Sequence, residues 1–114
     1  MANTFKLKTK SGVNGAALST VYTVPSSTTS VIIGLTISDI KGQSITTDAQ
    51  IVTAATSGEN GDDVYIIKDA PLPAGSSLEV MAGNKIVLKA TDAIQVKGSV
   101  ADAVDATLSI MEIT

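Results

Sequence analysis

The sequence predicts an all-β protein, a single-domain antiparallel β-sandwich, and three observations support this fold class. About eight or nine short runs of β-forming residues follow one another at intervals of roughly 8–12 residues, as in sandwiches and barrels. Apolar and polar residues alternate within most of these runs. No window shows the 3.6-residue apolar period of an amphipathic helix. The length of 114 residues suits one domain spanning 1–114. Jelly-roll connections, immunoglobulin-like connections and a closed barrel all remain open.

The first two strands are expected before Pro25. Residues 4–8 (TFKLK) alternate, with the aromatic ring and the leucine on one face and the two lysines on the other. The plain interpretation is an edge strand whose lysines oppose edge-to-edge aggregation. Residues 19–24 (STVYTV) form the second run, which ends at Pro25 because proline has no N–H for a sheet ladder.

The third run, 30–38 (SVIIGLTIS), is the most persuasive strand of the chain. Gly34 in its middle indicates a bulge or a close backbone approach. Residues 39–48 are polar and turn-prone, so a loop is expected there, followed by a strand over 49–55 (AQIVTAA).

The second half continues with a strand over 64–70 and a two-proline break at 71–75 (PLPAG). Further strands are expected over 76–81, 85–90, 93–98 and 103–113. The alternation slips after Ile110, which indicates a bulge there or burial of the last residues on both sides. The side chains expected in the core are Val31, Ile33, Leu35, Ile37, Ile86, Leu88, Val104, Ala106 and Leu108.

Composition argues against an enzyme. The chain contains no His and no Cys, so neither a Ser-His-Asp nor a Cys-His arrangement can be built, and zinc sites of nitrogen and sulfur ligands are excluded. No cofactor is expected. Glu59, Asp62 and Asp63 form a weak calcium candidate, because calcium takes oxygen ligands from acidic loops. The spacing of a calcium-binding loop is absent, so a solvated hairpin loop is favoured.

Charge and hydropathy narrow the choice of partners. The net charge is −3, all eight basic residues are lysines, and aromatic residues make up 3%. These features disfavour nucleic acid, which requires basic surfaces and stacking rings. No signal peptide and no membrane span are expected.

Charged residues make up 17%, which is low for a soluble protein and suits a surface that packs against other chains. The contact candidates lie in the first strand and in the loops: Phe5, Lys6, Lys8, Ser26, Thr28, Lys41 and Asn60.

Several motifs extend over nearly the whole chain: VYTVP, TT.VI.GL, D.YIIKDAPLPAGSSLEV, GNKIVLKATDAIQVKGS and the closing AVDATLSIMEIT. In this order they resemble a family of small virion structural proteins of tailed phages, notably marine and cyanobacterial phages. The resemblance implies a non-enzymatic, multi-copy protein that is made in the host cytoplasm and located in the virion.

Within that family, capsid decoration (cement) on the head exterior is the leading expectation. A neck, tail, baseplate or fibre-base position is the alternative. The implied partners are the major capsid protein or neck and tail proteins, together with further copies of the chain, with a trimer favoured. A carbohydrate-binding or adhesin-type β-sandwich is a second alternative, and it would require exposed aromatic residues or a metal loop.

Overall fold

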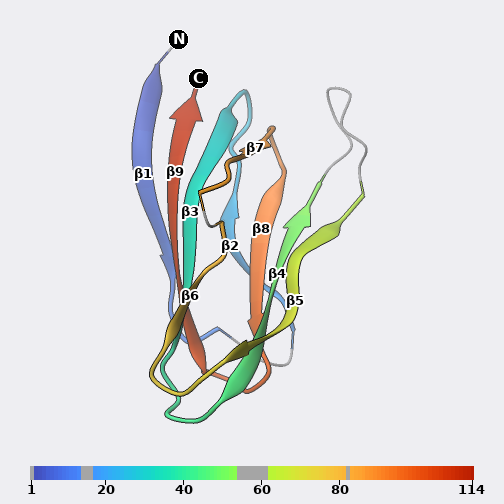
Figure 1. Ribbon diagram of the computed structural model, residues 1–114. Coiled ribbons are helices and arrows are strands. Elements are labelled where there is room, and N and C mark those ends of the chain that lie inside the picture. The colour runs from blue at the N-terminus through green and yellow to red at the C-terminus, as the bar shows by residue number, and fades with distance from the viewer. Residues whose placement is uncertain (1, 14–16, 54–61, 82) are drawn as a thin grey trace.

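The computed structural model describes residues 2–13, 17–53, 62–81 and 83–114, which form nine β-strands and no helix (Figure 1). The strands are β1 (Asn3–Lys10), β2 (Ser19–Thr23), β3 (Thr29–Asp39), β4 (Ile45–Val52), β5 (Val64–Leu72), β6 (Ser77–Glu79), β7 (Ile86–Leu88), β8 (Ala93–Gly98) and β9 (Val104–Ile113).

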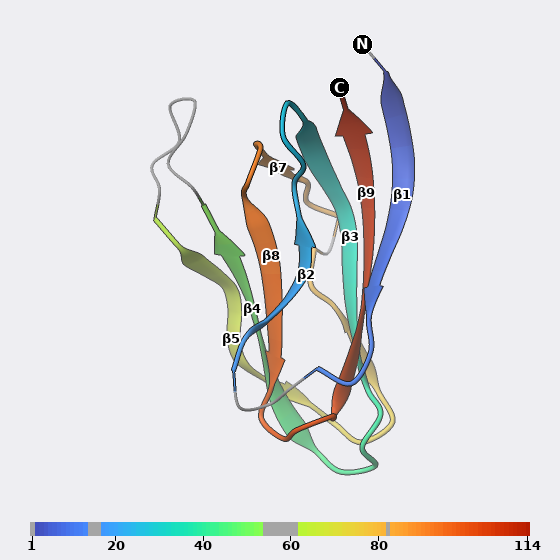
Figure 2. The same ribbon diagram turned by 180° about the vertical axis from the view of Figure 1, so that it is seen from behind.

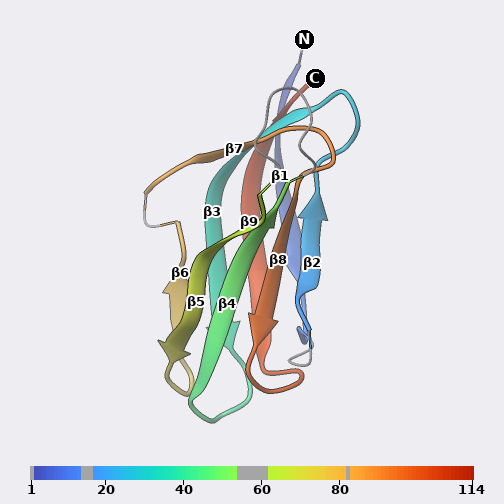
Figure 3. The same ribbon diagram turned by 90° about the vertical axis from the view of Figure 1, so that its right-hand side faces the viewer.

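Two antiparallel sheets pack face to face, as the expected β-sandwich requires (Figure 3). Sheet A has the order β1-β9-β3-β6, with β7 also paired to β3, and sheet B has the order β2-β8-β4-β5. If β6 and β7 are taken as one interrupted strand, the pairs are nested: first with last, second with next to last, and so inward to the β4–β5 hairpin. This nesting is the jelly-roll connection, one of the alternatives left open by the sequence.

The core lies between the sheets and is aliphatic. Leu35, Ile37 and Leu108 of sheet A are fully buried against Ile94 and Val96 of sheet B. Burial of each large aliphatic side chain stabilises the fold by about 1.5–3 kcal/mol relative to exposure. The predicted core residues Leu88, Val104 and Ala106 are buried as well, and Ile86 is partly buried.

The predicted inward positions of the first half of β3 are wrong. Ile32 is fully buried, whereas Ile33 is 37% exposed and Val31 is only half-buried. The register of β3 against β9 shifts between Ile32 and Gly34, so β3 contains a bulge at this point. The extra residue reverses the alternation, so the predicted inward positions of β3 are correct only from Leu35 onward. Gly34 did mark the irregularity.

Two strand boundaries also differ from the prediction. β4 begins at Ile45, inside the segment expected to be a loop, because Ile45 and Thr47 alternate inward and the Thr47 hydroxyl donates to the Lys97 carbonyl at 2.7 Å. β5 continues through Pro71 to Leu72. Proline is tolerated there since β5 is the edge strand of sheet B.

The slip of alternation near the C-terminus has a different cause from either expectation. β9 pairs with β1 in unbroken register and alternates to its end, so that Ile110 and Glu112 face inward and Met111 faces outward. A carboxylate thus occupies an interior position. The two ends of the described chain lie side by side, where Ala2 and Thr114 exchange two backbone hydrogen bonds of 3.0 Å (Figure 2).

Candidate protein-contact surface

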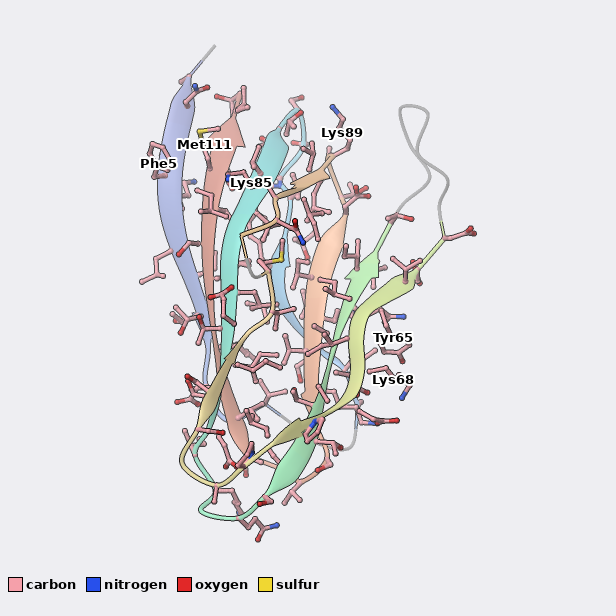
Figure 4. All side chains as sticks on the ribbon, viewed as in Figure 1. Phe5, Tyr65, Lys68, Lys85, Lys89 and Met111 are labelled. Carbon is pink, nitrogen blue, oxygen red and sulfur yellow. The ribbon has the colours of Figure 1, made fainter. Side chains whose placement is uncertain are left out.

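The outer face of sheet A carries an apolar row across four strands. The register places Phe5 of β1 opposite Met111 of β9, Met111 opposite Val31 of β3, and Val31 opposite Val87 of β7. Because these positions share one face of the sheet, their side chains are neighbours. Figure 4 shows Phe5 and Met111 on their adjacent strands.

Three further apolar side chains extend this row along the strands. Leu7 and Ile113 lie two residues from Phe5 and Met111, and Ile33 projects from the bulge of β3. We call the seven residues the apolar face: Phe5, Leu7, Val31, Ile33, Val87, Met111 and Ile113. Phe5 is 73%, Leu7 64% and Val87 55% exposed. A contiguous apolar surface of this kind on regular strands is typical of a site that binds another molecule.

The other half of the same outer face is polar. Thr9, Thr107 and Thr36 follow one another across β1, β9 and β3. Beside them, the Glu79 carboxylate accepts hydrogen bonds from the Thr36 hydroxyl at 2.9 Å and the Leu35 amide at 3.1 Å. The Glu79 carboxylate thus binds the β3 backbone between the segments of β3 that pair with β6 and with β7. These polar groups border the apolar face.

On the inner side of β1, opposite the apolar face, a charged cluster links β1 to β2 and β9. The Lys6 ammonium lies 2.7 Å from one oxygen of Glu112, whose side chain is 5% exposed, and the Tyr22 hydroxyl donates to the other oxygen at 2.6 Å. The Lys8 ammonium stands 5.9 Å from the centroid of the Tyr22 ring. Three strands, β1, β2 and β9, meet in this cluster.

Proton affinities in the cluster follow from these contacts. Hydrogen bonds from Lys6 and then from Tyr22 hold the pKa of Glu112 below its ordinary value, and burial opposes them only in part. Burial, assisted by the adjacent Glu112, raises the pKa of Tyr22 to about 12, while the Ser30 hydroxyl acts in the opposite direction. At neutral pH the cluster therefore holds an ionised Glu112 and a protonated Tyr22.

The outer face of sheet B has a different character. Its register places Thr20, Gln95, Gln50 and Tyr65 in a row across β2, β8, β4 and β5, and the Gln95 amide donates to the Thr20 hydroxyl at 3.2 Å. Tyr65 is 44% exposed.

Charged groups lie beside this polar row. The Lys68 ammonium lies 5.1 Å from the centroid of the Tyr65 ring (Figure 4). It also lies 3.5 Å from the Asp48 carboxylate. Asp48, and then Asp69, raise the pKa of Lys68. A small polar recess beside these groups is lined by Thr46, Asp48, Asp69, Lys97, Gly98 and Ser99.

The predicted contact residues are placed unevenly. Phe5 is exposed on the apolar face, whereas Lys6 and Lys8 face the charged cluster. Ser26 and Lys41 are exposed in loops. Thr28 is buried, with its hydroxyl donating to the Ser26 carbonyl at 3.0 Å, so the prediction that Thr28 offers a contact is wrong. Asn60 lies outside the described residues.

The weak calcium candidate can be followed only in part, because Glu59 also lies outside the described residues. Asp63 and Asp62 are exposed and bond to Thr53 across the base of the loop: the Asp63 carboxylate accepts from the Thr53 amide, and the Asp62 carbonyl accepts from the Thr53 hydroxyl, both at 3.1 Å. These bonds give both residues a structural role. In the described part of the chain, no three metal-ligating side chains gather.

Sequence reasoning missed Met111 and Ile113 as surface residues. Both could have been recognised, because each is an apolar residue at a position where the alternation of β9 would otherwise place a polar one.

Among the described residues there is no helix with the length and hydrophobicity of a membrane span.

Comparisons with known proteins add little. No family model matches the chain, and no curated protein matches it. One solved structure, described as "Bacillus endospore appendages form a novel family of disulfide-linked pili", is similar at 13% identity with a TM-score of 0.47. The match covers 96% of this chain and 85% of that one. At this distance the likeness carries no argument about function.

Proposed function

We propose that the protein is a non-enzymatic structural component of a tailed-phage virion, which acts by protein–protein contact through its apolar face. Its leading position is the head exterior, as a capsid decoration protein. A neck, tail, baseplate or fibre-base position is the alternative. The observation that carries the proposal is the row from Phe5 to Val87, four apolar side chains in register on the water-facing side of sheet A.

Leaving the apolar face in water costs free energy. Covering apolar surface is favourable by about 25 cal/mol per Å², although association consumes much of this gain through lost freedom of motion. None of the seven residues is charged, so a partner buries no unpaired ion there. A contact of modest strength becomes secure when many copies bind one shell at once.

The fold and the sequence resemblance support the same class of function by analogy. Jelly rolls occur in viral capsid proteins, and also in lectins and cupins, so the fold alone does not choose among these functions. The family resemblance described above favours the virion. A homo-oligomer is part of the proposal. A closed trimer, the state favoured from the sequence, would need two different open edges if it formed by strand pairing, and among the described strands β1 alone is long and regular.

Copy number in purified particles tests the proposal. Hundreds of copies per particle are expected for decoration of the head. A dozen or fewer would move the protein to the neck, tail, baseplate or fibre base. Absence from the particle would refute the structural role.

A carbohydrate-binding module is the second candidate function, and one observation favours it. Tyr65 is an exposed aromatic ring on a polar sheet, beside Gln50 and the Lys68 ammonium. Glycan-array binding that disappears in Tyr65→Ala and persists in Phe5→Ala would favour this candidate. An array without bound glycans would remove it.

A further inference from the structure

β1 is an open edge of sheet A with a regular backbone. Among the described residues, β1 pairs with β9 alone, over eight consecutive residues and without a shift of register. Figures 1 and 2 both show it as the outermost strand of its sheet. Because Ala2 and Thr114 form a hydrogen-bonded pair, even-numbered residues of β1 bond to β9. Asn3, Phe5, Leu7 and Thr9 therefore direct their N–H and C=O groups outward.

The other strand edges are poor templates for pairing. β6 and β7 have three residues each. β2 has five residues and shifts register against β8. β5 carries Pro71, two shifts of register against β4, and Asp69 at φ 52°. Short strands, prolines and bulges are the usual protections of sheet edges, and β1 has none of them.

Two of the three lysines of β1, Lys6 and Lys8, are engaged by their own chain, whereas Lys10 is exposed at the end of the strand. Lys6 is drawn to the buried Glu112 carboxylate at 2.7 Å, and Lys8 stands over the Tyr22 ring. Both lie on the inner side of the strand. On the outer side the edge presents Phe5 and Leu7, which are 73% and 64% exposed. Unpaired backbone and apolar side chains thus coincide on one strand, the combination that binds an added strand.

We propose that β1 pairs with β1 of a second copy of this chain, antiparallel and about a two-fold axis, which joins two A sheets into one continuous sheet. This inference rests on the proposed function, since it names the chain itself as one partner. A second copy is the fitting occupant because a long, regular edge requires an equally regular strand, and β1 is the strand in the described chain that meets this requirement. The same patch on both subunits then forms the interface, as a two-fold contact demands.

The register of this pairing follows from hydrogen-bond alternation. The outward groups belong to odd-numbered residues, so the axis passes through a residue rather than between two, and the longest overlaps of residues 2–10 place it at Phe5, Lys6 or Leu7. An axis at Leu7 sets Lys6 opposite the second copy's Lys8 twice, which like charges oppose. An axis at Phe5 places Leu7 opposite Asn3 of the second copy. It leaves Thr9 without an opposite residue among those that the structure describes.

An axis at Lys6 uses all the outward groups. Phe5 then lies opposite Leu7 of the second copy, Asn3 opposite Thr9, and Thr4 opposite Lys8. The one like-charge pair, between the two Lys6 side chains, is offset because each ammonium already contacts its own Glu112. We therefore assign this register.

A cross-linking experiment tests the register, and the chain is suited to it because it has no cysteine. Thr4 and Lys8 of opposite copies would form a non-hydrogen-bonded pair with Cα atoms about 4.5 Å apart, within the range of a disulfide. Within one chain they are about 13 Å apart along the strand. Thr4→Cys/Lys8→Cys should therefore give a disulfide-linked dimer on oxidation, whereas Thr4→Cys alone and Lys8→Cys alone should stay unlinked. A dimer in solution that fails to cross-link would refute the register.

Sedimentation of the purified full chain over a concentration series tests the pairing itself. Phe5→Lys should raise the dimer dissociation constant by about tenfold or more, which corresponds to about 1.4 kcal/mol. Val87→Lys makes the same change at the far side of the apolar face and should leave the dimer intact. Equal loss in both variants would indicate face-to-face stacking and would overturn edge pairing, as would a monomer at all concentrations or a closed trimer.

The two proposals fail separately. A monomeric chain that is still present in virions would refute β1 pairing and leave the structural role standing. A dimer that is absent from virions would refute the structural role and leave β1 pairing standing.

Discussion

The two sheets of this sandwich have similar inner faces and dissimilar outer faces. Inside, both present fully buried aliphatic side chains such as Leu108 and Ile94. Outside, sheet A presents the row from Phe5 to Val87, and sheet B presents Thr20, Gln95, Gln50 and Tyr65. The core requires only one apolar face per sheet. The apolar side chains outside sheet A therefore exceed the need of the fold, and this excess distinguishes the outer face of sheet A from the polar outer face of sheet B.

The largest expected effect compares the two sides of sheet A at neighbouring positions of β3. Leu35→Ala should lower the free energy of unfolding by about 2–5 kcal/mol, because it leaves a cavity in the core. Ile33→Ala, on the exposed bulge, should stay within about 1 kcal/mol. Chemical denaturation of both variants measures the difference. Equal losses would mean that the apolar face is part of the core, and the comparison would fail.

The two tyrosines provide the next contrast. The pKa of Tyr22 is raised to about 12 by burial, so the protonated ring favours the folded state. Its contribution is complete below the unfolded value of about 10 and is lost as pH rises toward 12, by an amount on the order of 2 kcal/mol. Tyr22→Phe should flatten this alkaline fall in melting temperature. Tyr65→Phe, on the outer face of sheet B, is the control and should retain it.

Each sheet also has a buried carboxylate with a lysine, and the two pairs differ in geometry. Glu112 contacts Lys6 at 2.7 Å and Tyr22 at 2.6 Å, whereas Asp48 lies 3.5 Å from the exposed Lys68. Glu112→Gln should cost about 1–3 kcal/mol at neutral pH, since it weakens hydrogen bonds to a charged group. Lys68→Ala should cost less than about 1 kcal/mol.

Acid titration sharpens the contrast between these pairs. The pKa of folded Glu112 lies below its unfolded value, so its stabilisation is present above that value and is lost as pH falls through the folded pKa. Melting curves between about pH 2 and 5 should fall less steeply for Glu112→Gln than for the unmodified protein. Parallel curves for Glu112→Gln and the unmodified protein would show that Glu112 does not contribute to the loss of stability in acid.

A matched pair of lysine substitutions compares the outer faces directly. If the proposed virion role holds, Met111→Lys on sheet A should reduce incorporation into particles by about tenfold, because a charge in the middle of an apolar contact must be desolvated. Gln95→Lys on sheet B should leave incorporation unchanged. Both should fold with ordinary stability, as denaturation curves can verify. A reversed result would move the contact surface to sheet B.

The smallest effect is expected at the loop between β4 and β5. Asp62→Asn/Asp63→Asn should change stability by no more than about 0.5 kcal/mol, as is usual for exposed positions. A chelator should leave the melting temperature unchanged. A fall of many degrees on chelation, absent from the double variant, would establish a calcium site in this loop.

The sequence predicts the sandwich because alternation and turn spacing record the inner face of each strand directly. It predicts the core positions Leu88, Val104, Ala106 and Leu108 for the same reason. It fails at Ile33, since a bulge shifts the phase by one residue and leaves no mark beyond Gly34. It fails at Glu112, since a carboxylate in an inward position depends on Lys6 and Tyr22, which are distant along the chain. It predicts Phe5 as a contact residue and misses Met111, whose exposure depends on which face of β9 turns inward.

The nested pairing of the strands also determines how the chain must assemble. The β4–β5 hairpin closes a short loop, whereas the pairing of β1 with β9 joins Asn3 to Ile113, almost the full length of the chain. Distant pairings form slowly, because the entropy of closing a long loop opposes them until other contacts are made. During synthesis β1 emerges before the other described strands, yet its partner β9 emerges after them. β1 therefore stays unpaired longest, and the contact between Lys6 and Glu112 forms only once β9 is available.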